Sequence, residues 1–171
     1  MIPRQYHSLP DMRKWDERFL DLADRIAAWS KDPSTKVGAV IIRPNRTLVS
    51  IGYNGFPRGI EDTYERYEDR ETKYQMVIHA EMNAILTATE ELKGYTLYVT
   101  PLHPCPQCAA TIIQVGIKRV VSRGNRREDW KERLAVSQKM FEEAGVQLDI
   151  IQGPSFATKL RVIKSSPSAK E

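Results

Sequence analysis

The chain has 171 residues, of which 41% are hydrophobic and 28% charged, and this suits a single globular domain that buries its own core. No run approaches the roughly 20 consecutive apolar residues that a membrane-spanning helix requires. Two cysteines are too few for a disulfide framework, and residues 1–13 lack the apolar stretch of a signal peptide. We therefore expect a cytoplasmic protein with no membrane partner.

The net charge of +4 is concentrated at the carboxyl end of the chain. Residues 153–171 carry a net +3, which leaves +1 on residues 1–152; the charged residues of this end are Lys159, Arg161, Lys164, Lys170 and Glu171. A basic end on a nearly neutral body is more typical of a solvated tail than of a nucleic-acid-binding arm. We expect one domain over residues 1–152, a flexible basic tail over residues 153–171, and no nucleic-acid partner.

The first half of the chain predicts a helix followed by a hairpin. Residues 15–30 place apolar side chains at helical spacing, and residues 37–42 and 48–53 are β-rich runs joined by a short turn. A loop rich in glycine and proline follows at residues 54–59, and residues 60–75 are polar enough to predict irregular structure.

The second half predicts alternating helices and strands. Helices are expected over residues 79–92, closed by Gly94, over residues 104–115, ended by Gly116, and over residues 130–144. Strands are expected over residues 96–100, 118–121 and 146–151. The alternation favours an α/β protein, a three-layer α/β/α sandwich around a mixed sheet of about five strands.

Cys105 and Cys108 are three residues apart at the start of a predicted helix. Residues at this spacing share a helix face, so both sulfurs can reach one metal ion, and a helix amino terminus favours the thiolate that binds metal. Pro106 is tolerated there because the first turn leaves its amide unpaired in any case. Taken alone, the pair would favour two buried free cysteines or a redox dithiol over a metal site.

His79 adds a nitrogen ligand, because it begins its own predicted helix one helix–strand unit earlier. Three protein ligands leave the fourth position of a zinc ion to water, which is the arrangement of catalytic zinc sites. His103 is the alternative fourth ligand, and it would make the site a closed structural one. Glu81, two residues after His79, is the candidate proton carrier beside the ion, although a glutamate in a first helical turn also simply stabilises a helix.

The pattern of His79 and Glu81 followed by Cys105 and Cys108 resembles the signature of zinc-dependent base deaminases. Within that superfamily the chain is similar to the deoxycytidylate (dCMP) deaminases over most of residues 15–146. The segments that carry the resemblance are residues 30–33 (SKDP), 37–39 (VGA), 51–55 (IGYNG), 72–74 (TKY), 79–85 (HAEMNAI), 105–109 (CPQCA), 112–118 (IIQVGIK) and 140–146 (MFEEAGV).

This resemblance implies hydrolysis of dCMP to dUMP and ammonia, in supply of thymidylate synthesis, with Zn2+ held by His79, Cys105 and Cys108 and with Glu81 moving the proton. It also implies that Asn54 hydrogen-bonds the deoxyribose and that the backbone of Ala80 contacts the base.

Regulation and assembly follow from the same resemblance. Members of the family are typically homohexamers that dCTP activates and dTTP inhibits, and Mg2+ is a candidate counter-ion of the triphosphate. The implied effector site lies around the loop formed by Asn54, Gly55, Phe56 and Arg58, where a solvated arginine is the alternative reading of Arg58.

The chain departs from many relatives at residues 122–127, which read SRGNRR. This segment leaves the carboxyl end of a strand, where α/β sheets bind their ligands, so Arg123 is a candidate contact for the substrate phosphate. A charged loop exposed to solvent explains the arginines equally well, and the choice between a monophosphate and a triphosphate substrate stays open.

Two other functions are compatible with the zinc motif. A tRNA adenosine deaminase would show a basic stripe and stacking aromatics, which the charge of +1 on residues 1–152 does not favour. A zinc-stabilised regulatory module without activity would not need Glu81. A cytidine deaminase for free nucleosides fits less well, because of the long segment over residues 56–77.

Overall fold

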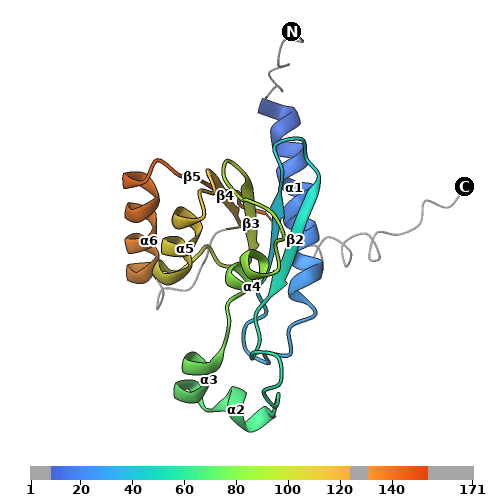
Figure 1. Ribbon diagram of the computed structural model, residues 1–171, viewed down its shortest axis with the longest axis vertical. Coiled ribbons are helices and arrows are strands. Elements are labelled where there is room, and N and C mark those ends of the chain that lie inside the picture. The colour runs from blue at the N-terminus through green and yellow to red at the C-terminus, as the bar shows by residue number, and fades with distance from the viewer. Residues whose placement is uncertain (1–8, 124–130, 154–171) are drawn as a thin grey trace, which may run out of the picture.

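The computed structural model describes residues 9–123 and 131–153, which form a mixed sheet of five strands in the order β2-β1-β3-β4-β5 (Figure 1). The strands are β1 (Gly38–Ile42), β2 (Leu48–Tyr53), β3 (Thr96–Thr100), β4 (Arg119–Ser122) and β5 (Gln147–Ile150). β1 pairs antiparallel with β2 and β3, whereas β3, β4 and β5 are parallel to one another. The predicted hairpin and the predicted mixed sheet are both confirmed.

Alternate residues along the strands face two separate cores, because successive side chains of a strand point to opposite faces. Val40, Tyr98 and Val121 pack with the buried face of α1 (Leu9–Ala27), and this helix covers one side of the sheet. Ala39 and Val99 pack on the opposite side, which is covered by α4 (Ala80–Leu86), α5 (Pro106–Gln114) and α6 (Lys131–Glu143). The three-layer α/β/α sandwich is therefore confirmed.

Two glycines let helices approach the sheet more closely than any side chain would allow. A Cβ at Gly38 would lie 2.1 Å from the carbonyl oxygen of Ala23 in α1. A Cβ at Gly52 would lie 2.2 Å from the carbonyl oxygen of Ala80 in α4. Each glycine thus sets the distance between the sheet and one covering helix.

The polar segment between β2 and α4 forms two short helices, so the prediction of irregular structure there is wrong. Thr63 caps the first of them, α2 (Tyr64–Glu68), and Asp69 caps the second, α3 (Arg70–Met76), by accepting backbone N–H groups. Among the described helices and strands, α2 and α3 pack only on each other, and Figure 1 shows them away from the sandwich.

The remaining predicted boundaries hold with two corrections. α1 begins at Leu9 and ends at Ala27, both earlier than predicted, and α4 ends at Leu86 with Thr87 as its C-cap rather than near Gly94. Gly94 instead takes a φ of +81° in the turn before β3. None of the described helices is both long and apolar enough to span a membrane. The predicted tail lies outside the described residues, apart from Gly153.

Candidate metal centre and active-site cavity

The three predicted metal ligands lie at the amino termini of α4 and α5. His79 and Cys105 are the N-cap residues of these helices, both in extended conformation, and neither caps its helix with a side-chain hydrogen bond. Their side chains are therefore left to face each other. Cys108, one turn into α5, completes the group.

The ligand atoms have the spacing that one zinc ion requires. Nδ1 of His79 lies 3.5 Å from Sγ of Cys105 and 3.3 Å from Sγ of Cys108. Tetrahedral zinc with ordinary Zn–N and Zn–S bonds separates such atoms by about 3.5 Å. Within residues 9–123 and 131–153, these three side chains form a group able to hold a metal ion, and His103 is not part of it.

The three ligand groups shift one another's pKa values. A hydrogen bond from Cys108 is the main cause that lowers the pKa of Cys105 to about 4, so this sulfur is a thiolate at neutral pH. The same hydrogen bond and burial raise the pKa of Cys108. The pKa of His79 is raised, mainly by its hydrogen bond with Cys105.

Glu81 lies in the first turn of α4 and is only 4% exposed. Burial is the main cause that raises the pKa of its carboxyl group above the usual value of 4.5. A carboxyl group whose pKa is raised holds a proton more readily than a free one, which suits a group that takes up a proton and passes it on.

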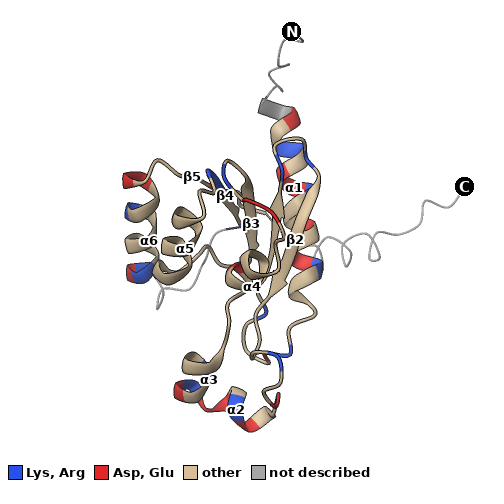
Figure 2. Cartoon of the chain, in the orientation of Figure 1, with Lys and Arg blue, Asp and Glu red and all other residues tan. Residues whose placement is uncertain are grey.

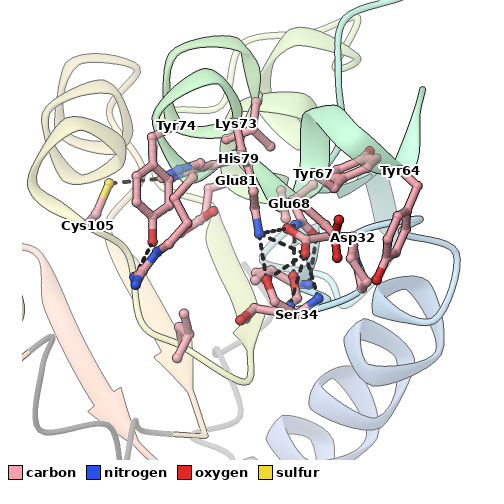
Figure 3. A pocket seen from close by; sticks show the side chains of 18 of the residues that line it. Asp32, Ser34, Tyr64, Tyr67, Glu68, Lys73, Tyr74, His79, Glu81 and Cys105 are labelled. Atoms are coloured by element: carbon pink, nitrogen blue, oxygen red, sulfur yellow. Dashed lines mark hydrogen bonds and ion pairs between the residues drawn. The ribbon is translucent and has the colours of Figure 1, made fainter. Parts of the chain in front are cut away.

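A cavity of about 510 Å3 opens beside the metal ligands and is drawn in Figure 3. His79, Ala80, Glu81 and Cys105 line one part of it. Its other walls come from residues 32–35, Val37 and Asn54, from α2 and α3, and from Val77, Leu102 and His103. The two short helices therefore form part of the site although they stand outside the sandwich.

A buried polar network crosses this cavity wall. Nζ of Lys73 on α3 donates to Oδ1 of Asp32 at 2.8 Å and to Oγ of Ser34 at 2.6 Å, as the dashed lines in Figure 3 show. Asp32 also accepts a hydrogen bond from Nδ2 of Asn54 at 3.2 Å. Lys73, Asp32 and Asn54 are 8%, 1% and 6% exposed, so the three groups form one buried unit.

The predicted effector residues lie along the loop that follows β2. Asn54 lines the cavity, whereas Gly55, Phe56 and Arg58 are not part of its lining. Gly55 pairs with Ile78, Phe56 stacks on Tyr67 at 4.3 Å between ring centroids, and Arg58 is exposed. The loop thus joins α2 to the segment that leads into the metal site.

Arg123 is not brought to the cavity, and its predicted phosphate contact has no support here. Its side chain is 5% exposed and forms ion pairs with three carboxylates of α1, those of Glu17 at 3.0 Å, Asp21 at 2.6 Å and Asp24 at 3.4 Å. Figure 2 shows acidic residues along α1. The guanidinium group therefore belongs to a structural cluster of ion pairs between the end of β4 and α1.

Sequence reasoning assigned no role to several residues that build the cavity. Lys73, Tyr67 and Tyr74 come from the segment that was predicted to be irregular, and Asp32 lies between the predicted helix and the predicted hairpin. The only signal for Asp32, Lys73 and Tyr74 was their place in short segments of the family resemblance, residues 30–33 and 72–74, and Tyr67 lies in neither segment.

One imidazole and two cysteine sulfurs lie beside a buried glutamate in an α/β/α sandwich. This combination defines a zinc-dependent hydrolase site. The family model for the cytidine and deoxycytidylate deaminase zinc-binding region matches residues 13–123. The chain therefore belongs to the cytidine and deoxycytidylate deaminase family.

Several relatives of known name share most of the chain. An uncharacterized deaminase from the luxG 3′ region of Aliivibrio fischeri is 48% identical over 139 residues, which cover 79% of this chain and 92% of the relative. Human deoxycytidylate deaminase is 40% identical over 142 residues, with 80% and 79% coverage. The crystal structure of dCMP deaminase from cyanophage S-TIM5 matches with a TM-score of 0.65 at 25% identity, over 81% of this chain and 98% of that one.

Proposed function

We propose that this protein hydrolyses dCMP to dUMP and ammonia, and that the dUMP supplies thymidylate synthesis in the cytoplasm. The observation that carries the proposal is the group of His79, Cys105 and Cys108 beside the buried Glu81, at one cavity. The choice of substrate is supported by the identity of 40% to human deoxycytidylate deaminase over 80% of the chain.

The chemistry divides between the metal and Glu81. Zinc held by His79, Cys105 and Cys108 would act as a Lewis acid that activates water at neutral pH. Glu81 takes the proton of the attacking water and delivers it to N3 of cytosine as oxygen adds to C4. Glu81 then takes the remaining proton from the new hydroxyl group on C4 and delivers it to the amino group. The C4–N bond breaks, ammonia leaves and a carbonyl group forms at C4.

The rest of the cavity would position the nucleotide. Asn54 hydrogen-bonds the deoxyribose, and the backbone of Ala80, which also lines the cavity, contacts the pyrimidine ring. This arrangement keeps C4 at the metal end of the cavity, where Glu81 lies.

The direct test is a Glu81→Gln variant, which removes the proton carrier and keeps the three ligands. We expect one zinc per chain by metal analysis and a fall in kcat of at least about a hundredfold. The substrate is tested by offering the wild-type protein dCMP, dCTP, cytidine and a tRNA side by side and following ammonia release. An active Glu81→Gln variant, or release of ammonia from a substrate other than dCMP, would contradict the proposal.

We also propose that the protein is a homohexamer, activated by dCTP and inhibited by dTTP with Mg2+, through the loop of Asn54, Gly55, Phe56 and Arg58. The family resemblance of this loop supports the proposal, and the Phe56–Tyr67 stack offers a link to the cavity wall. Either nucleotide should raise the melting temperature if it binds the folded protein. If neither nucleotide shifts the melting temperature, the regulatory proposal is wrong. Analytical ultracentrifugation would measure the number of chains in the oligomer.

A further inference from the structure

The carboxamide of Asn54 is held in one orientation by its neighbours. Its Oδ1 accepts the backbone N–H of Val37 at 2.8 Å, and its Nδ2 donates to the carbonyl oxygen of Thr35 at 2.9 Å. A backbone N–H can only donate and a carbonyl can only accept, so the positions of Oδ1 and Nδ2 cannot be exchanged.

The second N–H of Asn54 is also used, because Nδ2 donates to Oδ2 of Asp32 at 3.2 Å. An amide nitrogen carries two hydrogens and an amide oxygen two acceptor positions. Asn54 therefore has no donor left, and one acceptor position remains on Oδ1. A ligand that contacts this side chain in the cavity must bring a hydrogen-bond donor.

Asp32 can hold the second N–H because Lys73 keeps it charged and in place. Nζ of Lys73 lies 2.7 Å from Oδ2 of Asp32, and both side chains are almost fully buried, with 10% and 2% of their areas exposed. Asp32 also accepts the backbone N–H groups of Ser34 and Thr35. Lys73 thus connects α3 to the amide that faces the substrate.

We propose that Lys73 is a positioning residue of the substrate site: by holding Asp32, it keeps Asn54 as a hydrogen-bond acceptor only, and the site thereby selects a sugar with a free hydroxyl group. The inference rests on the proposed function, since dCMP offers the 3′-hydroxyl as its sugar donor. It assigns to the wall formed by α3 a role in choosing the sugar, separate from the chemistry at Glu81.

The test compares dCMP with 2′,3′-dideoxycytidine 5′-monophosphate, which lacks that hydroxyl group. For the wild-type protein we expect kcat/KM to favour dCMP by about tenfold or more, since a site built to bind a hydroxyl rejects the analogue without it. Lys73→Met should reduce this preference to about twofold or less, mainly through a higher KM for dCMP, with zinc still at one per chain. Lys73→Arg, which keeps a cation beside Asp32, should restore part of the preference.

Lys31→Met is the matched control, because Lys31 pairs with Asp62 at 2.9 Å but is 69% exposed and does not line the cavity. It should keep the wild-type preference. Lys73→Met also leaves a buried carboxylate without its partner, which destabilises the fold. The Asp32→Asn/Lys73→Met double variant removes both charges, so it should recover thermal stability. It should still lack the preference. The backbone N–H groups of Ser34 and Thr35 hold the new amide oxygen at the Oδ1 position, so the NH2 group faces Asn54 and cannot accept its hydrogen bond.

The outcomes separate the inference from the proposed function. A wild-type preference that persists in both Lys73→Met and the double variant would make Lys73 merely structural, and equal use of both nucleotides by the wild type would remove the acceptor role of Asn54. Turnover of dCMP with either result overturns only this inference. A zinc-loaded wild-type protein that fails to deaminate dCMP overturns the proposed function and the inference together.

Discussion

Arg123 shows how a single side chain can stabilise two layers of the fold at once. It leaves the end of β4 and reaches three carboxylates spaced along one face of α1, at positions 17, 21 and 24. A buried cation with several anionic partners is well compensated, whereas the loss of that cation leaves the carboxylates to repel one another.

We therefore expect Arg123→Ala to lower the free energy of unfolding by roughly 3 kcal/mol and to leave the KM for dCMP unchanged. Urea unfolding and steady-state kinetics measure the two quantities. Lys139→Ala, in an exposed pair with Glu143, is the control and should change neither. A raised KM with unchanged stability would return Arg123 to the phosphate site.

Asp32 makes the free energy of unfolding depend on pH, with its contribution lost at low pH. Burial raises the pKa of Asp32, but the hydrogen bonds from Lys73, Ser34 and Thr35 outweigh it and hold the pKa below the usual 3.8. An acid with a lowered pKa in the folded state stabilises it above the unfolded-state value, and this contribution is lost as the pH falls through the folded-state value.

Asp32→Asn should accordingly be less stable than the wild type at pH 7, and the difference should shrink below about pH 4. Urea unfolding between pH 7 and pH 3 follows it. Asp62→Asn, which breaks the exposed pair with Lys31, should show a much smaller difference at pH 7. Parallel pH profiles for wild type and Asp32→Asn would refute this account.

Residues at the metal site were predictable from sequence, while residues held by tertiary contacts were not. His79, Glu81, Cys105 and Cys108 stand in a short pattern at two helix starts, and the structure places them together. The acidic positions of α1 share a helix face, which was a readable signal, but the sequence alone does not show which strand end lies opposite them. For that reason the ion pairs of Arg123 with α1 were not predicted from the sequence.

The two glycines that allow a helix to approach the sheet closely, Gly38 and Gly52, act on opposite faces of the sheet. Gly52 sets the distance between the sheet and α4, the helix that has His79 as its N-cap and Glu81 in its first turn. Gly38 sets the distance between the sheet and α1, which carries none of the three metal ligands. The two positions make a matched pair of tests.

Both Gly52→Ala and Gly38→Ala should lower the free energy of unfolding by roughly 2–3 kcal/mol, because the new methyl group overlaps a helix backbone. Only Gly52→Ala should also weaken zinc binding, since it displaces α4 and with it His79. Zinc competition with a chelator measures the affinity. Equal zinc affinities in the two variants would contradict the role assigned to Gly52.

The element boundaries that sequence missed were decided by side chains. The helical pattern after residue 79 was extended to residue 92, but Thr87 hydrogen-bonds the carbonyl oxygens of Asn83 and Ile51, and α4 stops there. Glu90, beyond it, is bound instead by Arg43. The helices α2 and α3 escaped prediction because they are short and polar, and their caps at Thr63 and Asp69 resemble ordinary loop residues.

The metal site joins two helices that cover the same face of the sheet. His79 belongs to the start of α4, and Cys105 and Cys108 to the start of α5. A metal that binds only the folded arrangement stabilises the protein by mass action.

Removal of zinc by a chelator should therefore lower the melting temperature. A hundredfold excess of zinc over its Kd contributes about 2.7 kcal/mol, and each kcal/mol shifts Tm by about 2–4 °C in a domain of this size. Calorimetry with and without chelator should show a fall of about 5–10 °C, reversed by added zinc. Glu81→Gln should show the same fall, because it removes no ligand; a chelator without effect would contradict the ligand assignment.

The separation of α2 and α3 from the sandwich has a consequence for how such enzymes diverge. The pair is inserted between β2 and α4, forms part of the cavity wall, and packs on no other described helix or strand. A change of length or composition in this insertion alters no strand register and no metal ligand. Natural selection can therefore rebuild the wall that meets the substrate while the sheet and the helices that carry the metal ligands are inherited intact. Related chains that differ in substrate should differ first in this segment.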